Sequence, residues 1–379
     1  MVYLSDHDKK NKYKPFNTII VGGGGILGFS FLGAVHALQY LNVVKFENIN
    51  NFVGSSVGAI IVLLLYLGYS PFFVFRTLFD VNFEDSDSLC SFEDILNFPK
   101  EKGLLDAHII SDIVATFLEY EHISKNVTFE ELANIVKTKT NKLQKLYIAG
   151  LNISKGETET FSIDSTPNMC VLLALRISIC IPILFRPVKF QNCYYIDGAY
   201  LQNSLFQQFF EGNKNKDCRA VLIESYTKMQ TFGINDYYKK EKKTTKDGNL
   251  KFEGSKEVIM NADSPNTNNN INEKDNSNTR KLQTDHLETT DIFNNEDLIG
   301  VIQMIEQLFN CNSIYSRTIQ RQLVDNFSKN TNSIRFSIPV ENTQNSLNFF
   351  LSREDRIKLF KSGFQEVDLK WTETIKKQN

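Results

Sequence analysis

The stretch from Gly54 to Gly58 reads Gly-Ser-Ser-Val-Gly and lies between a short apolar segment, 49–53, and an unbroken apolar run, 59–67. A G-x-S-x-G sequence between a strand and a helix is typical of a nucleophile elbow, a sharp turn that lifts a serine hydroxyl clear of a sheet. The backbone of that serine is strained, and side chains two positions to either side would collide. Only Ser56 has glycine at both positions, so it is the predicted nucleophile. The turn also places it at a helix N-terminus, where the dipole favours developing negative charge.

A second glycine-rich turn precedes the elbow. Residues 16–21 are predicted to form a buried strand, four glycines follow from Gly22 to Gly25, and a helix with apolar residues at helical spacing follows Gly28. Four successive glycines after a strand leave backbone N–H groups free to point at one spot. The natural occupant of that spot is a negatively charged oxygen, which belongs either to a phosphate or to the oxyanion of a reaction intermediate.

The phosphate alternative is a nucleotide-binding loop. Gly23, Gly25 and Gly28 match the G-x-G-x-x-G dinucleotide fingerprint. That fingerprint requires an acidic residue at the end of the next strand, about 20 residues further on. Glu47 lies at about this distance, but it precedes the candidate strand at 49–53, and the elbow ends that strand. The sequence therefore favours an oxyanion over a nucleotide.

Composition and charge narrow the class of protein. The chain has 379 residues, a hydrophobic content of 42% that can supply a core, and a net charge of −2 that indicates no nucleic-acid partner. Its six cysteines show no C-x-x-C and no zinc spacing. With no hydrophobic signal-peptide segment near Met1, we expect an intracellular, cytoplasmic protein. The longest apolar run, 57–67, is too short to span a bilayer, which leaves peripheral contact with a membrane surface open.

Strand and helix signals alternate over the first 200 residues, which predicts an α/β layered fold. Eight asparagines fall within 261–278, and residues 261–281 hold only two aliphatic side chains, too few to offset the entropy of ordering. We therefore expect a single domain with a mostly disordered insertion. Its expected parts are a flexible N-terminus (1–15), a catalytic part (16–235), the insertion (236–297) and a helical C-terminal part (298–379).

Further helices are predicted at 70–78, 92–96, 108–121, 129–137, 168–178, 298–323 and 352–363, and further strands at 146–151, 158–163, 188–195, 220–225 and 334–338.

A serine hydroxyl is a poor nucleophile unless a base takes its proton. In α/β-hydrolases the histidine comes late in the chain, but here the only late histidine, His286, lies in the predicted insertion, and His36 is expected to pack on the helix after the glycine loop. A carboxylate is therefore expected to act directly. The best candidate is Asp197, which ends an apolar strand and precedes the small residues Gly198 and Ala199. In a largely dry pocket, desolvation raises the pKa of a carboxyl group toward neutrality and makes it a better base. The alternative is a plain Asp-Gly turn.

Taken in order, Gly23-Gly24-Gly25-x-x-Gly28, Gly54-x-Ser56-x-Gly58 and Asp197-Gly198-Ala199 resemble the motifs of the patatin-like phospholipases, a family that includes the cytosolic phospholipase A2 enzymes. Residues 178–187, which read Ser-Ile-Cys-Ile-Pro-Ile-Leu-Phe-Arg-Pro, resemble the family's Ser-x-x-x-Pro-x-x-Phe-x-Pro segment. Gly33 falls where the family has the next glycine of its first helix. The resemblance covers about 16–230, with a weaker likeness over 350–365.

This resemblance implies a three-layer fold with a mostly parallel central sheet flanked by helices. It also implies a Ser56–Asp197 dyad, an oxyanion hole in the loop of Gly23, Gly24, Gly25 and Gly28, no cofactor or metal, and a phospholipid or other acyl-lipid ester as substrate. Leu27 stands where the family usually has Arg or Lys, which leaves substrate preference open. An inactive lipid-binding protein remains an alternative. The aromatic residues at 72, 73, 75 and 79 either pack in the core or form an interfacial patch.

Overall fold

The computed structural model describes residues 15–79, 97–98, 100–200, 218–227, 333–340 and 351–376. All of them belong to one compact unit, Met1–Lys228 with Asp297–Asn379. Apart from Pro15, the predicted N-terminal segment lies outside the described residues, as do the predicted insertion and the predicted helices at 92–96 and 298–323.

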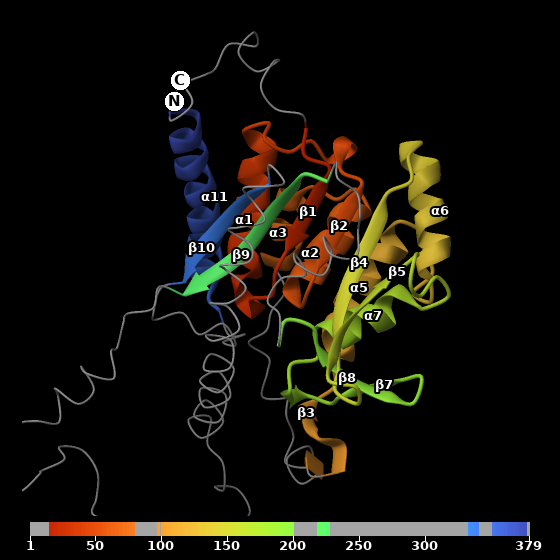
Figure 1. Cartoon of the computed structure of the whole chain (residues 1–379). Helices are drawn as coiled ribbons and strands as arrows, with labels where there is room; N and C mark the ends of the chain where they lie inside the picture. The colour runs from red at the N-terminus through yellow and green to blue at the C-terminus, as the bar shows by residue number, and fades with distance from the viewer. Residues whose placement is uncertain are drawn as a thin grey trace, which may run out of the picture. The chain divides into compact units, whose positions relative to one another are not determined.

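Eight of the described strands form one large, mostly parallel sheet (Figure 1). Its parallel part follows the order β10-β9-β1-β2-β4, with strands β1 (Thr18–Val21), β2 (Asn51–Gly54), β4 (Lys145–Asn152), β9 (Ala220–Thr227) and β10 (Ile334–Val340). Antiparallel strands complete it beside β4, namely β5 (Glu157–Ser162), β7 (Val188–Phe190) and β8 (Cys193–Asp197). Two short strands, β3 (Gly103–Leu105) and β6 (Ile183–Phe185), pair separately. The α/β class with a mostly parallel central sheet is confirmed.

Helices alternate with these strands along the chain. They are α1 (Gly28–Tyr40), α2 (Val57–Tyr66), α3 (Pro71–Phe79), α5 (His108–Tyr120), α6 (Phe129–Thr140), α7 (Val171–Ser178) and α11 (Arg353–Lys376), with short 3₁₀ helices η1 (Gly25–Leu27) and η2 (Phe46–Asn48). Thr128 caps α6: its side chain accepts a hydrogen bond from the amide of Glu131, and the Glu131 carboxylate accepts one from the amide of Thr128. None of the helices in the described ranges is both long and apolar enough to cross a bilayer.

Both faces of the sheet are buried. Successive strand residues point to opposite faces, so Ile19 and Phe52 pack in the large core that the helices share, whereas Ile20 and Val53 belong to a second, smaller apolar cluster. All four side chains are at most 1% exposed. A parallel sheet covered on both faces is the expected arrangement for alternating strands and helices.

The contact between α1 and α11 corrects one predicted boundary. A Cβ atom on Gly33 would lie 1.9 Å from the carbonyl oxygen of Phe360, and one on Gly363 would lie 1.8 Å from that of Ser30. The two helices therefore cross with backbone against backbone at a pair of glycines. The prediction that the last helix ends near Gly363 was wrong, because this glycine allows close packing and α11 continues to Lys376.

The start of α7 is a second correction. The sequence predicts a helix from residue 168, but the helix begins at Val171. The preceding residues are bound to another segment, since Cys170 forms a β-bridge with Thr128 and the Met169 carbonyl accepts the amide of Phe129. Long-range backbone pairing therefore delays the helix by three residues.

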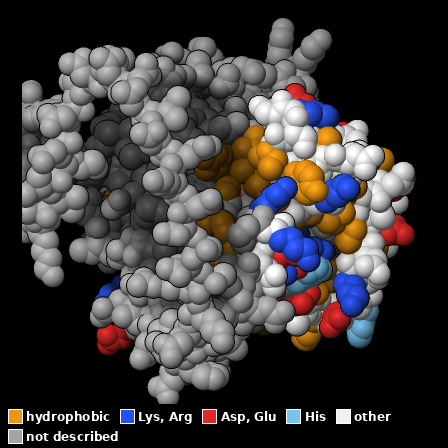
Figure 2. All heavy atoms as spheres, turned by 90° about the horizontal axis from the view of Figure 1, so that it is seen from below, with side chains coloured by type: hydrophobic (Ala, Val, Ile, Leu, Met, Phe, Trp, Pro, Cys, Tyr) orange, Lys and Arg blue, Asp and Glu red, His pale blue; other side chains and the backbone are white. Residues whose placement is uncertain are grey.

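The aromatic residues of α3 are neither all packed in the core nor all exposed as an interfacial patch. Phe75 is 9% exposed, whereas Phe72 and Phe73 are 50% and 44% exposed. Seen from below, the described surface carries apolar side chains with Lys and Arg side chains beside them (Figure 2). Tyr194, on β8, is 40% exposed, and the Nζ atoms of Lys102 and Lys189 lie 5.2 and 6.0 Å from its ring centre. The strand that ends at Asp197 thus exposes an aromatic ring with two lysines beside it, one on β7 and one directly before β3.

Candidate active site

Ser56 occupies a strained turn between β2 and α2. Its backbone angles are φ 54° and ψ −131°, in a region that L-residues rarely adopt. A Cβ atom on Gly54 would lie 2.6 Å from the Cα of Ala59, and one on Gly58 would lie 2.2 Å from the carbonyl oxygen of Val21. Both glycines are therefore sterically required, and the predicted elbow is present with Ser56 directly before the first residue of α2.

Asp197 ends β8 and is held by the two small residues that follow it. A Cβ atom on Gly198 would lie 2.5 Å from the carbonyl oxygen of Ala149, so this position must be glycine for the strand to approach β4. The amide of Ala199 donates to Asp197 Oδ1 at 2.7 Å. The Asp-Gly-Ala sequence thus packs and orients a carboxylate that is only 3% exposed.

The register of β4 brings the two side chains together. Gly54 pairs with Ile148 of β4 on one side, and Asp197 pairs with Gly150 on the other, two residues further along the strand. Ser56 lies two residues beyond Gly54. Its hydroxyl donates to Asp197 Oδ2 at 2.6 Å, although 141 residues separate the two in sequence.

Burial tunes the carboxyl group of Asp197. Desolvation raises its pKa from 3.8 to about 7, against the opposing effect of the hydrogen bonds from Ser56 and Ala199. In the described part of the chain, no lysine, arginine or histidine side chain forms an ion pair with it. A carboxylate with this pKa, hydrogen-bonded to a serine hydroxyl, has the properties of a general base near neutral pH.

The glycine loop closes on the elbow from the other side. Gly25 has φ 54°, and a Cβ atom on Gly28 would lie 2.4 Å from Val57 Cγ2. The amide of Leu27 donates to the Gly24 carbonyl. Within the described ranges no protein acceptor takes the amides of Gly24 and Gly25. Gly23 lies in the same turn, directly after Gly22, whose amide is bound to Ile223 of β9.

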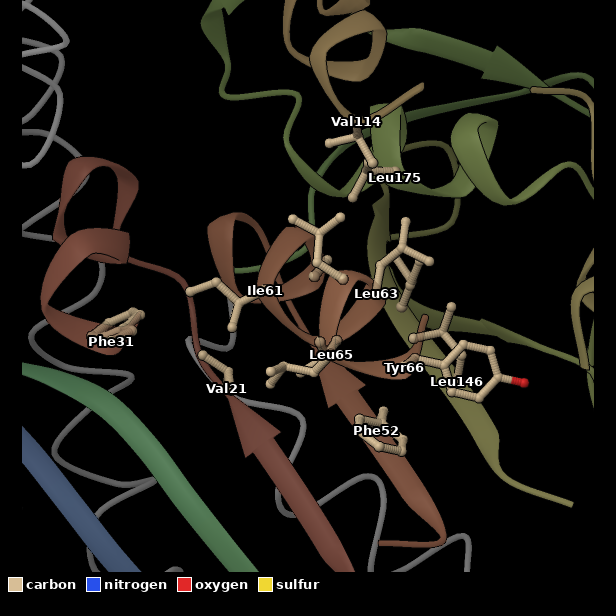
Figure 3. Close-up of a cluster of buried hydrophobic side chains, with 14 of the residues drawn as sticks. Val21, Phe31, Phe52, Ile61, Leu63, Leu65, Tyr66, Val114, Leu146 and Leu175 are labelled. Atoms are coloured by element: carbon tan, nitrogen blue, oxygen red, sulfur yellow. The ribbon is translucent and has the colours of Figure 1, made fainter. Parts of the chain in front are cut away.

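A cavity of about 130 Å³ reaches Ser56. Figure 3 shows two of its wall residues, Ile61 of α2 and Val114 of α5, in the surrounding apolar cluster. Apart from Ser56, every lining residue is apolar or glycine: Gly25, Ile26, Gly28, Phe29, Leu32, Val57, Ile60, Ile61, Leu78, Ile110, Ile113, Val114, Ile179, Ile181 and Leu351. The site is therefore one polar reacting group at the edge of a hydrophobic chamber.

The other acid–base candidates lie elsewhere. The ring of His36 packs among Phe72, Phe360 and Phe364, with centroid distances of 5.7 to 5.9 Å, and burial lowers its pKa. Glu47 lies in η2, before β2. The expectation that His36 packs on its helix is confirmed, and the carboxylate needed at the end of β2 for a dinucleotide site is absent, because the elbow occupies that position.

Sequence reasoning missed the contacts of Ser178 and the composition of the cavity. Ser178 is fully buried at the end of α7, and its Oγ accepts the amide of Ser56 at 3.0 Å. Its place at the head of the 178–187 segment was a signal, but that segment does not reveal which backbone its hydroxyl binds. The cavity walls come from several helices, so no single stretch of sequence marks them.

The sequence matches one protein family and is similar to curated viral proteins. A family model described as patatin-like phospholipase matches residues 19–210. Among curated proteins, "Probable lipid hydrolase 463L" of Invertebrate iridescent virus 6 is 31% identical over 255 residues, which cover 63% of this chain and 81% of the relative. "Uncharacterized protein R571" of Acanthamoeba polyphaga mimivirus is 27% identical over 197 residues, which cover 52% of this chain and 62% of the relative.

Solved structures show a weaker likeness. VipD from Legionella pneumophila is 17% identical with a TM-score of 0.38, and the match covers 60% of this chain and 53% of VipD. Human GIVD cytosolic phospholipase A2 is 12% identical with a TM-score of 0.34, and the match covers 55% of this chain and 42% of the human protein. This chain thus spans about half of each solved chain.

Proposed function

The chain belongs to the patatin-like phospholipase family, and we propose that it is a lipid hydrolase in which Ser56 and Asp197 form the catalytic dyad. The observation that carries this proposal is the 2.6 Å hydrogen bond from the Ser56 hydroxyl to the Asp197 carboxylate. It joins a nucleophile on a strained elbow to a base whose pKa is about 7. A nucleophile within hydrogen-bond reach of its base is the arrangement that acyl transfer through a serine requires.

In the proposed reaction, Asp197 accepts the hydroxyl proton as Ser56 Oγ forms a bond to the ester carbonyl carbon. The carbonyl oxygen then carries the negative charge of a tetrahedral intermediate. When the bond to the leaving alcohol breaks, Asp197 returns the proton to that alcohol, and an acyl-enzyme ester on Ser56 remains. Asp197 next takes a proton from water, whose oxygen attacks the acyl carbon. The fatty acid leaves, and the proton returns to Ser56.

The glycine loop is proposed to hold the oxyanion. The amides of Gly24 and Gly25 have no protein acceptor among the described residues, and Gly25 lines the cavity beside Ser56. The N-terminus of α2 adds a favourable dipole at the same place. Removing one oxyanion donor typically lowers kcat by about 100- to 1,000-fold.

The cavity supports an acyl chain as the group beside the scissile bond. Its apolar walls offer no hydrogen-bonding side chain except Ser56, so a substrate gains there by burying methylene groups, at about 0.8 kcal/mol each. Leu27 is 3% exposed and packs in the core, so this position supplies no cation to a headgroup phosphate. The proposed substrates therefore include neutral glycerides as well as phospholipids.

Peripheral contact with a lipid surface follows from this substrate class. Tyr194 lies three residues before Asp197 on β8, so about 10 Å of strand separates the exposed ring from the base. Lys102 and Lys189 flank that ring, and amphipathic aromatic side chains with basic neighbours suit an anionic interface.

The test is incubation of the purified full-length chain with mixed phospholipids and neutral glycerides, followed by mass spectrometry of the released fatty acids. We expect release by the wild type and none above background by Ser56→Ala, with the same folded circular dichroism spectrum. Full activity of Ser56→Ala would refute the assignment. Lipid binding without release by the wild type would favour the inactive lipid-binding alternative.

A further inference from the structure

The backbone of the nucleophile is held by a buried hydroxyl from another part of the chain. Ser56 precedes the first turn of α2, where amides have no acceptor within the helix. Its amide donates instead to Ser178 Oγ at 3.0 Å, across 122 residues of sequence. We propose that Ser178 is a positioning residue, which fixes the strained turn at Ser56 so that the nucleophile hydroxyl points at Asp197. This inference rests on the proposed role of Ser56 as nucleophile.

The same short segment also holds the base. The carbonyl of Ser178 accepts the amide of Gly198 at 3.4 Å, and the carbonyl of Cys180 accepts the amide of Asp197 at 2.7 Å. Strands β2 and β8 are not neighbours, because β4 lies between them. Residues 178–180 therefore connect the elbow to the end of β8 directly. The segment sets the separation of hydroxyl and carboxylate, with the Ser178 side chain as its contact to the elbow.

A buried serine could instead merely fill space, and Ser55 offers the matched comparison. Its side chain is also 0% exposed, it adjoins the same elbow, and its Oγ has no hydrogen-bond partner in the described part of the chain. Ser55→Ala therefore removes the same atom as Ser178→Ala without removing a hydrogen bond. A difference between the two variants reports on the contact with the Ser56 amide.

Positioning and packing also differ in their effect on pH dependence. The hydrogen bond from Ser56 lowers the pKa of Asp197. If the elbow relaxes and that bond lengthens, the pKa of Asp197 rises. The acid limb, which is the range over which the reaction rate of Ser56 rises with pH, then moves to higher pH. The other titratable group facing Asp197 among the described residues is the Cys180 thiol. Burial raises its pKa to about 12, so it does not titrate in this range. A loss of packing alone would lower reactivity equally at every pH.

The experiment measures the second-order rate at which a long-chain alkyl fluorophosphonate modifies the full-length protein between pH 5 and 9, by intact-protein mass spectrometry. We expect Ser178→Ala to react about 10- to 100-fold more slowly than wild type, the loss expected when a buried amide is left without an acceptor, with its acid limb shifted to higher pH. Ser55→Ala should stay within about twofold of wild type, with an unshifted limb.

Should Ser178→Ala fail to fold, Ser178→Cys is the variant that decides, because it keeps the shape of the side chain and replaces the hydroxyl with a larger, weaker acceptor. Its rate of modification should lie between that of the wild type and that expected for Ser178→Ala. If the folded Ser178 variant reacts at the wild-type rate with an unshifted acid limb, the positioning role is wrong, whereas the assignment of Ser56 as nucleophile stands. If the wild type itself were not modified, the proposed function would fail, and this inference with it.

Discussion

The hydroxyl of Ser56 lies 2.6 Å from the carboxylate of Asp197, and no histidine stands between them. The pair shares one hydrogen bond in a site where Asp197 is 3% exposed. In the proposed mechanism proton transfer needs no third side chain, since burial raises the pKa of the carboxyl group to about 7 despite the hydrogen bonds from Ser56 and Ala199.

The pH dependence of hydrolysis follows from that pKa. As the proposed base, Asp197 can accept a proton only when it is ionised, so kcat/KM should rise with pH through a single acid limb with its midpoint near 7. The measurement is kcat/KM against pH with a soluble p-nitrophenyl acyl ester, which avoids pH effects on vesicles. A flat profile between pH 5 and 8 would contradict the assignment of Asp197 as base.

The same carboxyl group makes folding stability depend on pH. Its folded pKa of about 7 exceeds the ordinary 3.8. Between these values the folded state keeps a proton that the unfolded state has released, so the wild-type free energy of unfolding falls as pH rises through this window. Asp197→Asn cannot ionise. Its stability relative to wild type should therefore increase from pH 4 to pH 8 by up to about 4 kcal/mol, measured by urea unfolding. A pH-independent difference would show that the pKa of Asp197 is not raised.

The volume of the cavity should determine acyl-chain preference. Ile113 of α5 lines the cavity, and Ile113→Trp would fill part of it. Each methylene that no longer fits forfeits about 0.8 kcal/mol, or roughly a fourfold loss in kcat/KM. We expect a shift toward shorter acyl esters in a chain-length series. Ile357→Trp is the matched control, because Ile357 lies on α11, is 36% exposed and does not line the cavity. Equal chain-length profiles for both variants would mean that the acyl chain binds elsewhere.

The crossing of α1 and α11 should be intolerant of a single methyl group. A Cβ atom at Gly363 would lie 1.8 Å from the Ser30 carbonyl oxygen, so Gly363→Ala must push the helices apart. We expect a loss of about 1–3 kcal/mol in the free energy of unfolding. Lys361→Ala, at an exposed position of α11, should change stability by less than about 0.5 kcal/mol. Similar unfolding curves for the two variants would show that the close crossing does not form.

The parts of the site that could be predicted are those with a local cause. Gly54 is required by contacts within its own turn, with Ala59 and Gly58, so the motif around Ser56 identifies itself in the sequence. Gly58 and Gly198 contact the distant backbone of Val21 and Ala149, and the sequence marks them only through the short motifs that contain them. The apolar strand segments beside them were also recognisable, because parallel strands buried on both faces are hydrophobic throughout.

The parts that could not be predicted depend on distant partners. Gly363 has the sequence signature of a helix end, but its reason is the backbone of Ser30, more than 300 residues away in sequence. Residue 170 bridges to Thr128 and delays α7, and the Ser178 hydroxyl finds the amide of Ser56. Nothing local to these residues specifies the partner, so only the assembled sheet and helices reveal it.

The most direct test of the dyad is the site at which a long-chain fluorophosphonate attaches. After reaction at pH 8, peptide mapping of the full-length protein should find one adduct, on Ser56. The adduct should be missing from Ser56→Ala, and its rate of formation should fall by at least about 100-fold in folded Asp197→Asn, since general-base assistance typically contributes about 100- to 10,000-fold. An adduct on another residue, or an unchanged rate in Asp197→Asn, would contradict the account.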